Sequence, residues 1–121
     1  MSRIKTFRDL MVWQKGKELT KGVYRATAHM PKSEIFGLTS QMRRAAVSIP
    51  SNIAEGYAKR TRPEYLRGLK IACGSLAELA TQWEITIEME MIRHDARITE
   101  LLAEIDRMLS SLIAKLEAKN S

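Results

Sequence analysis

The sequence has little of what builds strands, tight turns or cross-links. Its 121 residues include one cysteine, three prolines and six glycines, and aromatic residues make up 6%. The single thiol, Cys73, excludes a disulfide within the chain and is typical of a reducing compartment. So few glycines and prolines disfavour a strand-rich fold with many tight turns. The length is that of one domain, residues 1–121, which can bury a core of its own.

Long hydrophobic runs are also absent. No segment approaches the ~20 continuous apolar residues that a membrane-spanning helix needs. The N-terminal stretch has no apolar run long enough for a signal peptide. We therefore expect a cytoplasmic protein that does not associate with a membrane.

Charge is distributed unevenly along the chain, whose net charge is +6. Residues 1–61 hold 12 Lys and Arg against 4 Asp and Glu, a net charge of +8. Residues 62–121 hold 8 against 10, a net charge of −2. This asymmetry indicates either an anionic partner or acid–base contact between subunits.

Apolar residues recur at intervals of three and four in four segments, which is the pattern of amphipathic helices. In the first segment the stripe runs through Val12, Leu19 and Val23, and Trp13 and Tyr24 widen the apolar face. Helices of this length with short connections predict an all-α fold, an antiparallel up-down-up-down four-helix bundle. The predicted helices span residues of about 8–30, 37–59, 63–92 and 95–118.

Pro50 lies inside the second predicted helix. Apolar residues keep helical register on both sides of it, which predicts one helix kinked at Pro50 and not two helices. The proline removes the hydrogen bond to the carbonyl of Ala46, and Ser48, Ser51 and Asn52 lie close enough to help satisfy that carbonyl. A true break at the proline is the alternative.

Capping residues mark the starts of the third and fourth helices. Thr61 or Arg62 can cap the third helix, where Pro63 suits the first turn and Glu64 suits the positive helix end. Asp95 can cap the fourth helix.

The third predicted helix carries two apolar stripes. A second, weaker stripe consists of Ala72, Leu79 and Thr86, and a helix with more than one apolar side is buried on more than one side. The main stripe has the spacing of a coiled-coil seam and should form the core. It contains Leu66, Leu69, Cys73, Leu76, Ala80, Trp83 and Ile87.

Patterns that carry catalysis or bind metals are scarce. Neither His29 nor His94 is followed by a metal ligand three or four residues later. The Glu-x-x-His spacing of di-iron bundles and the glycine loop that binds phosphate are absent. On the core seam, Cys73 is expected to be a small apolar residue and not a nucleophile. We therefore expect no enzyme, no metal and no cofactor.

Basic residues form the strongest pattern outside the predicted core. Lys17, Lys21 and Arg25 are spaced by four, so like charges stack along one side of a helix, which is unfavourable unless something neutralises them. Nucleic acid phosphates would do so, giving salt-sensitive binding that reads backbone and shape. The alternative is pairing with the acidic side of the third and fourth helices, within or between chains. The candidate nucleic-acid-binding residues are Lys17, Lys21, Arg25, Arg43, Arg44, Lys59, Arg60 and Arg62.

Two polar residues, Asn52 and Glu55, lie near the apolar stripe of the second helix. Buried polar side chains need partners, and Arg43 or Arg67 from nearby turns could supply them. We expect a structural network here and not a ligand site.

Three segments closely resemble the bacterial 23S rRNA intervening sequence proteins: FRDLMVWQKGKEL, FGLTSQMRRAAVSIPSNIAEGYAKR and EYLRGLKIACGSLAELATQWEI. The resemblance runs from about Phe7 to Ile92, and its middle segment is the most specific. Trp83 stands where the family motif often has a smaller apolar residue. The matching motif residues are Trp13, Gln14, Arg43, Arg44, Ser48 to Gly56 with Pro50, Asn52 and Glu55, then Tyr65, Arg67, Glu78 and Gln82.

The resemblance implies a four-helix bundle that assembles into a ring-like homopentamer. It also implies distant kinship to the accessory protein of diversity-generating retroelements, a basic pentameric barrel that binds nucleic acid and a reverse transcriptase. Some family members are encoded within insertions in the large-subunit rRNA gene, which describes a gene location and not an activity. Two hypotheses follow: an oligomer that binds RNA or DNA, or a structural adaptor whose basic and acidic faces mediate self-assembly or bind a protein partner.

Overall fold

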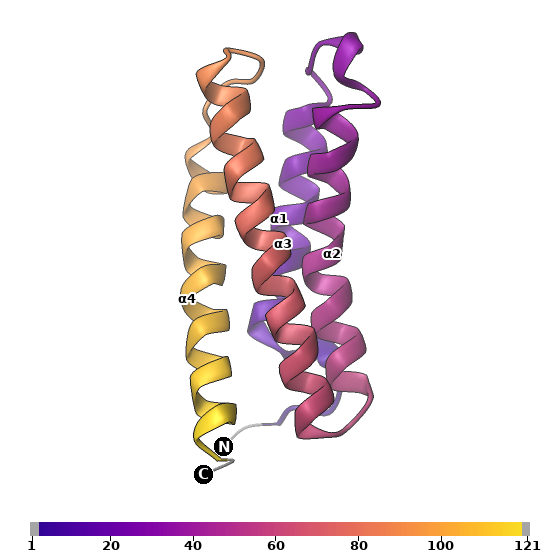
Figure 1. The fold of residues 1–121 in the computed structure, drawn as a ribbon, viewed down its shortest axis with the longest axis vertical. Coiled ribbons are helices and arrows are strands. Elements are labelled where there is room, and N and C mark those ends of the chain that lie inside the picture. The colour runs from indigo at the N-terminus through magenta and orange to yellow at the C-terminus, as the bar shows by residue number, and fades with distance from the viewer. Residues whose placement is uncertain (1–2, 120–121) are drawn as a thin grey trace.

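The computed structural model describes residues 3–119 and shows four α-helices with no strand in that range. The helices lie side by side and alternate in direction along the long axis (Figure 1). The predicted all-α four-helix bundle is confirmed. Within the described range, no helix combines the length and hydropathy that a membrane span requires. The elements are η1 (Phe7–Asp9), α1 (Met11–Thr27), η2 (Lys32–Glu34), α2 (Leu38–Ala58), α3 (Arg62–Glu88) and α4 (Ala96–Ala118).

Helix α1 is shorter than the predicted 8–30, because it begins at Met11 and ends at Thr27. A separate 3-10 turn, η1, precedes it. The backbone amides of Lys5 and Thr6 donate to the Asp9 carboxylate at 2.9 and 3.1 Å. This capping box starts η1, and the extended backbone of Leu10 ends it before the chain starts again as α1.

The predicted caps of α3 and α4 are present. The Thr61 hydroxyl accepts from the Glu64 amide at 3.3 Å, and the Asp95 carboxylate accepts from two backbone amides. Helix α3 ends at Glu88 and not near residue 92, since Glu90 takes a left-handed φ of 57° that no helix continues.

Helix α2 runs without interruption from Leu38 to Ala58, so one helix passes through Pro50 as predicted. The bend itself stays a prediction. The donor to the Ala46 carbonyl was predicted wrongly: it is the Thr20 hydroxyl of α1, at 3.0 Å, and not a polar residue of α2. The same hydroxyl bonds to the Gly16 carbonyl at 2.9 Å. The donor comes from another helix, so no local pattern could reveal it.

Helices α2 and α3 approach closely at two glycines. A Cβ on Gly68 would lie 2.4 Å from the backbone oxygen of Asn52, and one on Gly56 would lie 2.8 Å from the backbone oxygen of Glu64. Both obstacles are backbone atoms, which cannot move aside as a side chain can. Only glycine therefore fits at these two positions.

The stripe of α3 that was expected to be weaker is the more deeply buried one. Ala72, Leu79 and Thr86 are all 0% exposed, whereas Cys73 and Ile87 of the predicted main stripe are half-buried. The reason is that α3 packs more extensively against α2 than against α4. The side of α3 that faces α4 therefore remains partly open.

Candidate nucleic-acid interface

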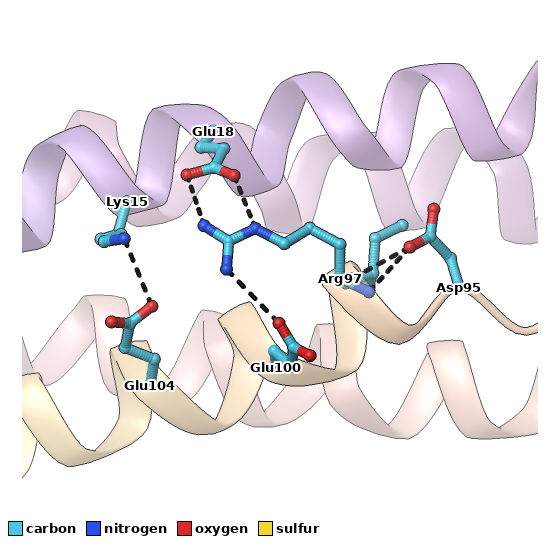
Figure 2. Close-up of polar contacts among 7 residues, drawn as sticks. Lys15, Glu18, Asp95, Arg97, Glu100 and Glu104 are labelled. Carbon is cyan, nitrogen blue, oxygen red and sulfur yellow. Dashed lines mark hydrogen bonds and ion pairs between the residues drawn. The ribbon is translucent and has the colours of Figure 1, made fainter.

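Ion pairs connect α4 to the flank of α1 that faces it (Figure 2). Lys15 lies 3.5 Å from Glu104, and the Arg97 guanidinium contacts both oxygens of Glu18 at 2.8 and 3.0 Å. Arg97 also reaches Glu100 at 3.5 Å. The hydrogen bond from Arg97 lowers the pKa of Glu18 below its usual value. Glu104 of α4 thus neutralises Lys15, which is not one of the predicted nucleic-acid-binding residues.

The predicted stack of cations on α1 is exposed to solvent. Lys17, Lys21 and Arg25 make no ion pair within residues 3–119. The Lys17 ammonium lies 4.6 Å from the ring centroid of Trp13, a cation–π contact that orients it without neutralising its charge. Four residues of helix advance about 6 Å, so three cations follow one another along this side.

Arg43 of α2 forms hydrogen bonds with the C-terminal end of α1. Its guanidinium donates to the Thr27 hydroxyl at 2.8 Å and to the Tyr24 carbonyl at 3.3 Å. It also lies 4.6 Å from the centroid of the Tyr24 ring. Tyr24 was expected on the apolar face of the helix, but it is 44% exposed. An exposed aromatic ring therefore lies beside Arg43, although the sequence pattern had placed this ring on the buried face.

Arg44 belongs to a different seam from Arg43. It lines a hollow of about 290 Å³ between α2 and α3, together with Ser48, Ser75 and Glu78. Arg44 and Glu78 form no ion pair in the described part of the chain. The two arginines separate because neighbouring residues of a helix point about 100° apart.

The network around Asn52 is structural, but its partners differ from those predicted. The Asn52 amide donates to the Ser48 carbonyl at 2.8 Å and to the Ser48 hydroxyl at 2.9 Å. The Ser48 and Ser75 hydroxyls lie 2.8 Å apart, which links α2 to α3. Neither Arg43 nor Arg67 takes part, since Arg43 faces α1 and Arg67 is exposed.

The remaining motif residues also have their places in the fold. Glu55 is exposed and makes no ion pair within the described range, which excludes it from the Asn52 network. The buried Gln82 contacts Gln41 and Glu78 at 3.4 Å each. Gln14 donates to the Arg8 carbonyl at 2.8 Å and so holds η1 to α1.

The predicted binding residues Lys59, Arg60 and Arg62 lie at the turn between α2 and α3, and they differ in their contacts. Lys59 pairs with Glu64 at 3.7 Å, and Arg62 donates to the Lys119 carbonyl at 3.2 Å. Arg60 has a left-handed φ of 62° and makes no ion pair in the described chain. Of the three, Arg60 is the cation best placed to meet an outside anion.

A pocket beside this turn escaped sequence reasoning. It brings η1 together with the α2–α3 turn, and its wall includes Phe7, Tyr57 and Tyr65 next to Lys5 and Arg8. These residues are about 50 positions apart in the chain, and nothing in their spacing indicates contact. The only local hint is that each segment contains both aromatic and basic residues.

The described residues contain no cluster of metal-ligating side chains, and the thiol of Cys73 is partly buried. Within residues 3–119 no group of three or more His, Cys, Asp and Glu side chains could hold a metal ion. Cys73 lies in an apolar groove of about 720 Å³ between α3 and α4. Burial, with a smaller effect from Asp106, raises the pKa of the Cys73 thiol. A thiol that is harder to ionise is a poorer nucleophile.

Comparison with known proteins identifies relatives by fold and by sequence. The chain is similar to the crystal structure of a protein with unknown function from the S23 ribosomal protein family of Bacteroides thetaiotaomicron VPI-5482, with a TM-score of 0.74 and 25% sequence identity. The similarity covers 85% of this chain and 95% of that one. No curated protein matches the chain. The family described as 23S rRNA-intervening sequence protein matches residues 8–114, and the chain belongs to that family.

Proposed function

We propose that this protein is a non-enzymatic nucleic-acid-binding bundle, with RNA as its ligand, and that it acts as a cytoplasmic homo-oligomer. The observation that carries the proposal is the contrast between the two flanks of α1. Lys15 and Glu18 pair with α4, whereas Lys17, Lys21 and Arg25 have no carboxylate partner within residues 3–119. Stacked like charges destabilise a helix. An anionic ligand bound on this side would offset the repulsion among these three cations.

The geometry suits a phosphate backbone. Cations that recur at each turn of a rigid helix can follow successive phosphates, and they release counterions when they bind. Tyr24 and the adjacent Arg43 guanidinium offer a surface on which an exposed base can stack. Such contacts position a strand and carry little base specificity. The family name, which refers to 23S rRNA, supports RNA as the first ligand to test.

The test is RNA binding measured against salt concentration. For Lys17→Ala/Lys21→Ala/Arg25→Ala we expect the slope of log K against log salt to fall by about 2, because each phosphate contact on a single strand contributes about 0.7. A matched control, Lys70→Ala/Arg107→Ala/Lys115→Ala, removes the same charge from α3 and α4 and should leave the slope nearly unchanged. If both variants lose the same affinity, net charge and not the α1 face is responsible, and the proposal fails.

A second candidate is an assembly in which the basic face of one copy meets the acidic side of the next. The groove between α3 and α4 favours it, because Glu84, Glu88 and Asp106 line that groove with no lysine or arginine among its described residues. Light scattering on the same α1 variant separates the candidates. A variant that loses RNA but keeps its mass supports binding, and one that falls into smaller species supports assembly. A homopentamer is the proposed stoichiometry to compare with the measured mass.

A further inference from the structure

A pocket of about 540 Å³ lies at the end of the bundle, where η1 meets the turn between α2 and α3. Its lining includes no Asp or Glu among the described residues. The two nearest carboxylates in the sequence are engaged elsewhere: Asp9 accepts from backbone amides of η1, and Glu64 pairs with Lys59. The lining residues are Ile4, Lys5, Thr6, Phe7, Arg8, Tyr57, Ala58, Arg60, Thr61, Arg62 and Tyr65.

Cations on this wall come from both of the elements that form the pocket. Lys5 and Arg8 belong to the N-terminal segment, and Arg60 belongs to the α2–α3 turn. None of these three makes an ion pair within residues 3–119. The Arg8 guanidinium lies 4.6 Å from the centroid of the Phe7 ring, which orients it without neutralising it. A site with several unpaired cations and no acid selects an anion.

Aromatic rings supply the remaining wall. Tyr57 and Tyr65 meet edge to face with ring centroids 5.3 Å apart. The Tyr65 hydroxyl is buried and has no hydrogen-bond partner among the described residues. Burial also raises the pKa of this phenol. Because the hydroxyl has almost no accessible surface, the Tyr65 ring, and not its hydroxyl, lines the pocket.

We propose that this pocket binds one nucleotide, with the phosphate among Lys5, Arg8 and Arg60 and the base against the tyrosine rings. Inorganic phosphate would leave the aromatic wall unused, and an apolar ligand would leave the cations unused. The inference deepens the proposed function, because it assigns the pocket to the end of a bound strand and rests on that function for its choice of ligand. A mononucleotide is too small to span the α1 face, so the two proposals can be tested separately.

The experiment titrates the full chain with AMP and UMP, and with adenosine and inorganic phosphate as partial ligands, by calorimetry and by NMR of the tyrosine resonances. We expect saturable binding of the mononucleotides that is tighter than that of either partial ligand. Arg60→Gly should weaken it about tenfold, which is the size of a lost charge-assisted hydrogen bond. Glycine suits the left-handed φ of residue 60, so this variant keeps the turn. Tyr65→Phe keeps the ring and removes only the enclosed hydroxyl, so it should leave binding nearly unchanged.

Arg107→Ala is the control, since it removes an exposed α4 cation outside the pocket and should leave AMP binding unchanged. The absence of saturable AMP binding at millimolar concentration, or binding that Arg60→Gly leaves intact, overturns the nucleotide site. RNA binding that still depends on Lys17, Lys21 and Arg25 would then leave the proposed function standing. AMP binding without any α1-dependent RNA binding would support the nucleotide site and contradict the proposed function of the α1 face.

Discussion

Helices α2 and α4 both pack against α1 and α3, but by different means. Around α2 the contacts involve the backbone: Gly68 meets the Asn52 carbonyl, and Thr20 donates to the Ala46 carbonyl at 3.0 Å. A Cβ on Gly16 would lie 3.4 Å from Pro50, so α1 lies directly against the proline.

Around α4 the contacts run between side chains. Lys70 pairs with Glu117 at 2.8 Å, and Arg97 pairs with Glu18 at 2.8 Å, all four being well exposed to solvent. An apolar groove remains between α4 and α3, with Trp83 in its wall. Backbone contacts tolerate no added atom, whereas exposed ion pairs contribute little to stability. None of the ion pairs within residues 3–119 involves Lys17, Lys21 or Arg25, the cations on the outer face of α1.

The largest effect should come from Gly68→Ala. The added Cβ would meet the Asn52 carbonyl oxygen, a backbone atom, so α2 and α3 must separate, and we expect a loss of about 3 kcal/mol, the upper end for overpacking. Urea denaturation measures it. Gly74→Ala on the same helix meets no atom within 4 Å and should gain about 0.5 to 1 kcal/mol. Equal effects at the two positions would contradict the close crossing.

Thr20→Val should come next, with a loss of about 1 to 2 kcal/mol, because it leaves the Ala46 carbonyl without a donor. Valine keeps the shape of the side chain, so packing changes little. The control is Thr81→Val, since the Thr81 hydroxyl bonds only to the Ala77 carbonyl of its own exposed turn. In a Pro50→Ala background the helix amide returns, and thermal denaturation should show a smaller cost for Thr20→Val. An undiminished cost there would mean that Thr20 acts by packing.

On the α4 side, Gly22→Ala should be tolerated. Its Cβ would lie 3.5 Å from Ile98, an ordinary contact distance, and alanine in a helix gains about 0.5 to 1 kcal/mol over glycine. Chemical denaturation would show the gain. A loss of similar size would mean that α1 and α4 are packed as tightly as α2 and α3, and the comparison would fail.

The smallest effect belongs to Glu18→Gln, which breaks the pair with Arg97. Both side chains are largely exposed, so we expect a loss of a few tenths of a kcal/mol near neutral pH. The folded state lowers the pKa of Glu18, so the contribution is present above the unfolded pKa and is lost as the pH falls through the folded value. The stability difference between the two proteins, followed by denaturation from pH 7 to pH 3, should vanish at the acid end. A difference that persists there would exclude the charge pair as its cause.

Local patterns predicted the helices well because their causes lie within one or two turns. Thr61 and Asp95 cap the helices they were expected to cap, and the apolar register through Pro50 correctly indicated a single helix. The errors arose where a local signal competed with another element. The extended backbone of Leu10 ended η1 before α1, and Tyr24 turned outward beside Arg43.

The candidate site was harder to predict than the fold. Its cations were identified by their spacing, but the sequence could not show which of them acidic groups on other helices neutralise. Arg43 and Arg44 illustrate the limit, since adjacent residues with the same charge occupy different seams. The nucleotide pocket was missed altogether, because its two halves meet only when η1 folds back onto the α2–α3 turn.

Amino-acid order alone was enough to establish four amphipathic helices, their caps and the stacked cations of α1. Each depends on residues within about four positions of one another, the reach of helical hydrogen bonds and neighbouring side chains. Folding decided that Glu18 pairs with Arg97, 79 positions away, and that Thr20 rather than a residue of α2 serves the Ala46 carbonyl. It also decided which cations have no acidic partner among the described residues, because pairing requires proximity in space, which helical periodicity does not encode.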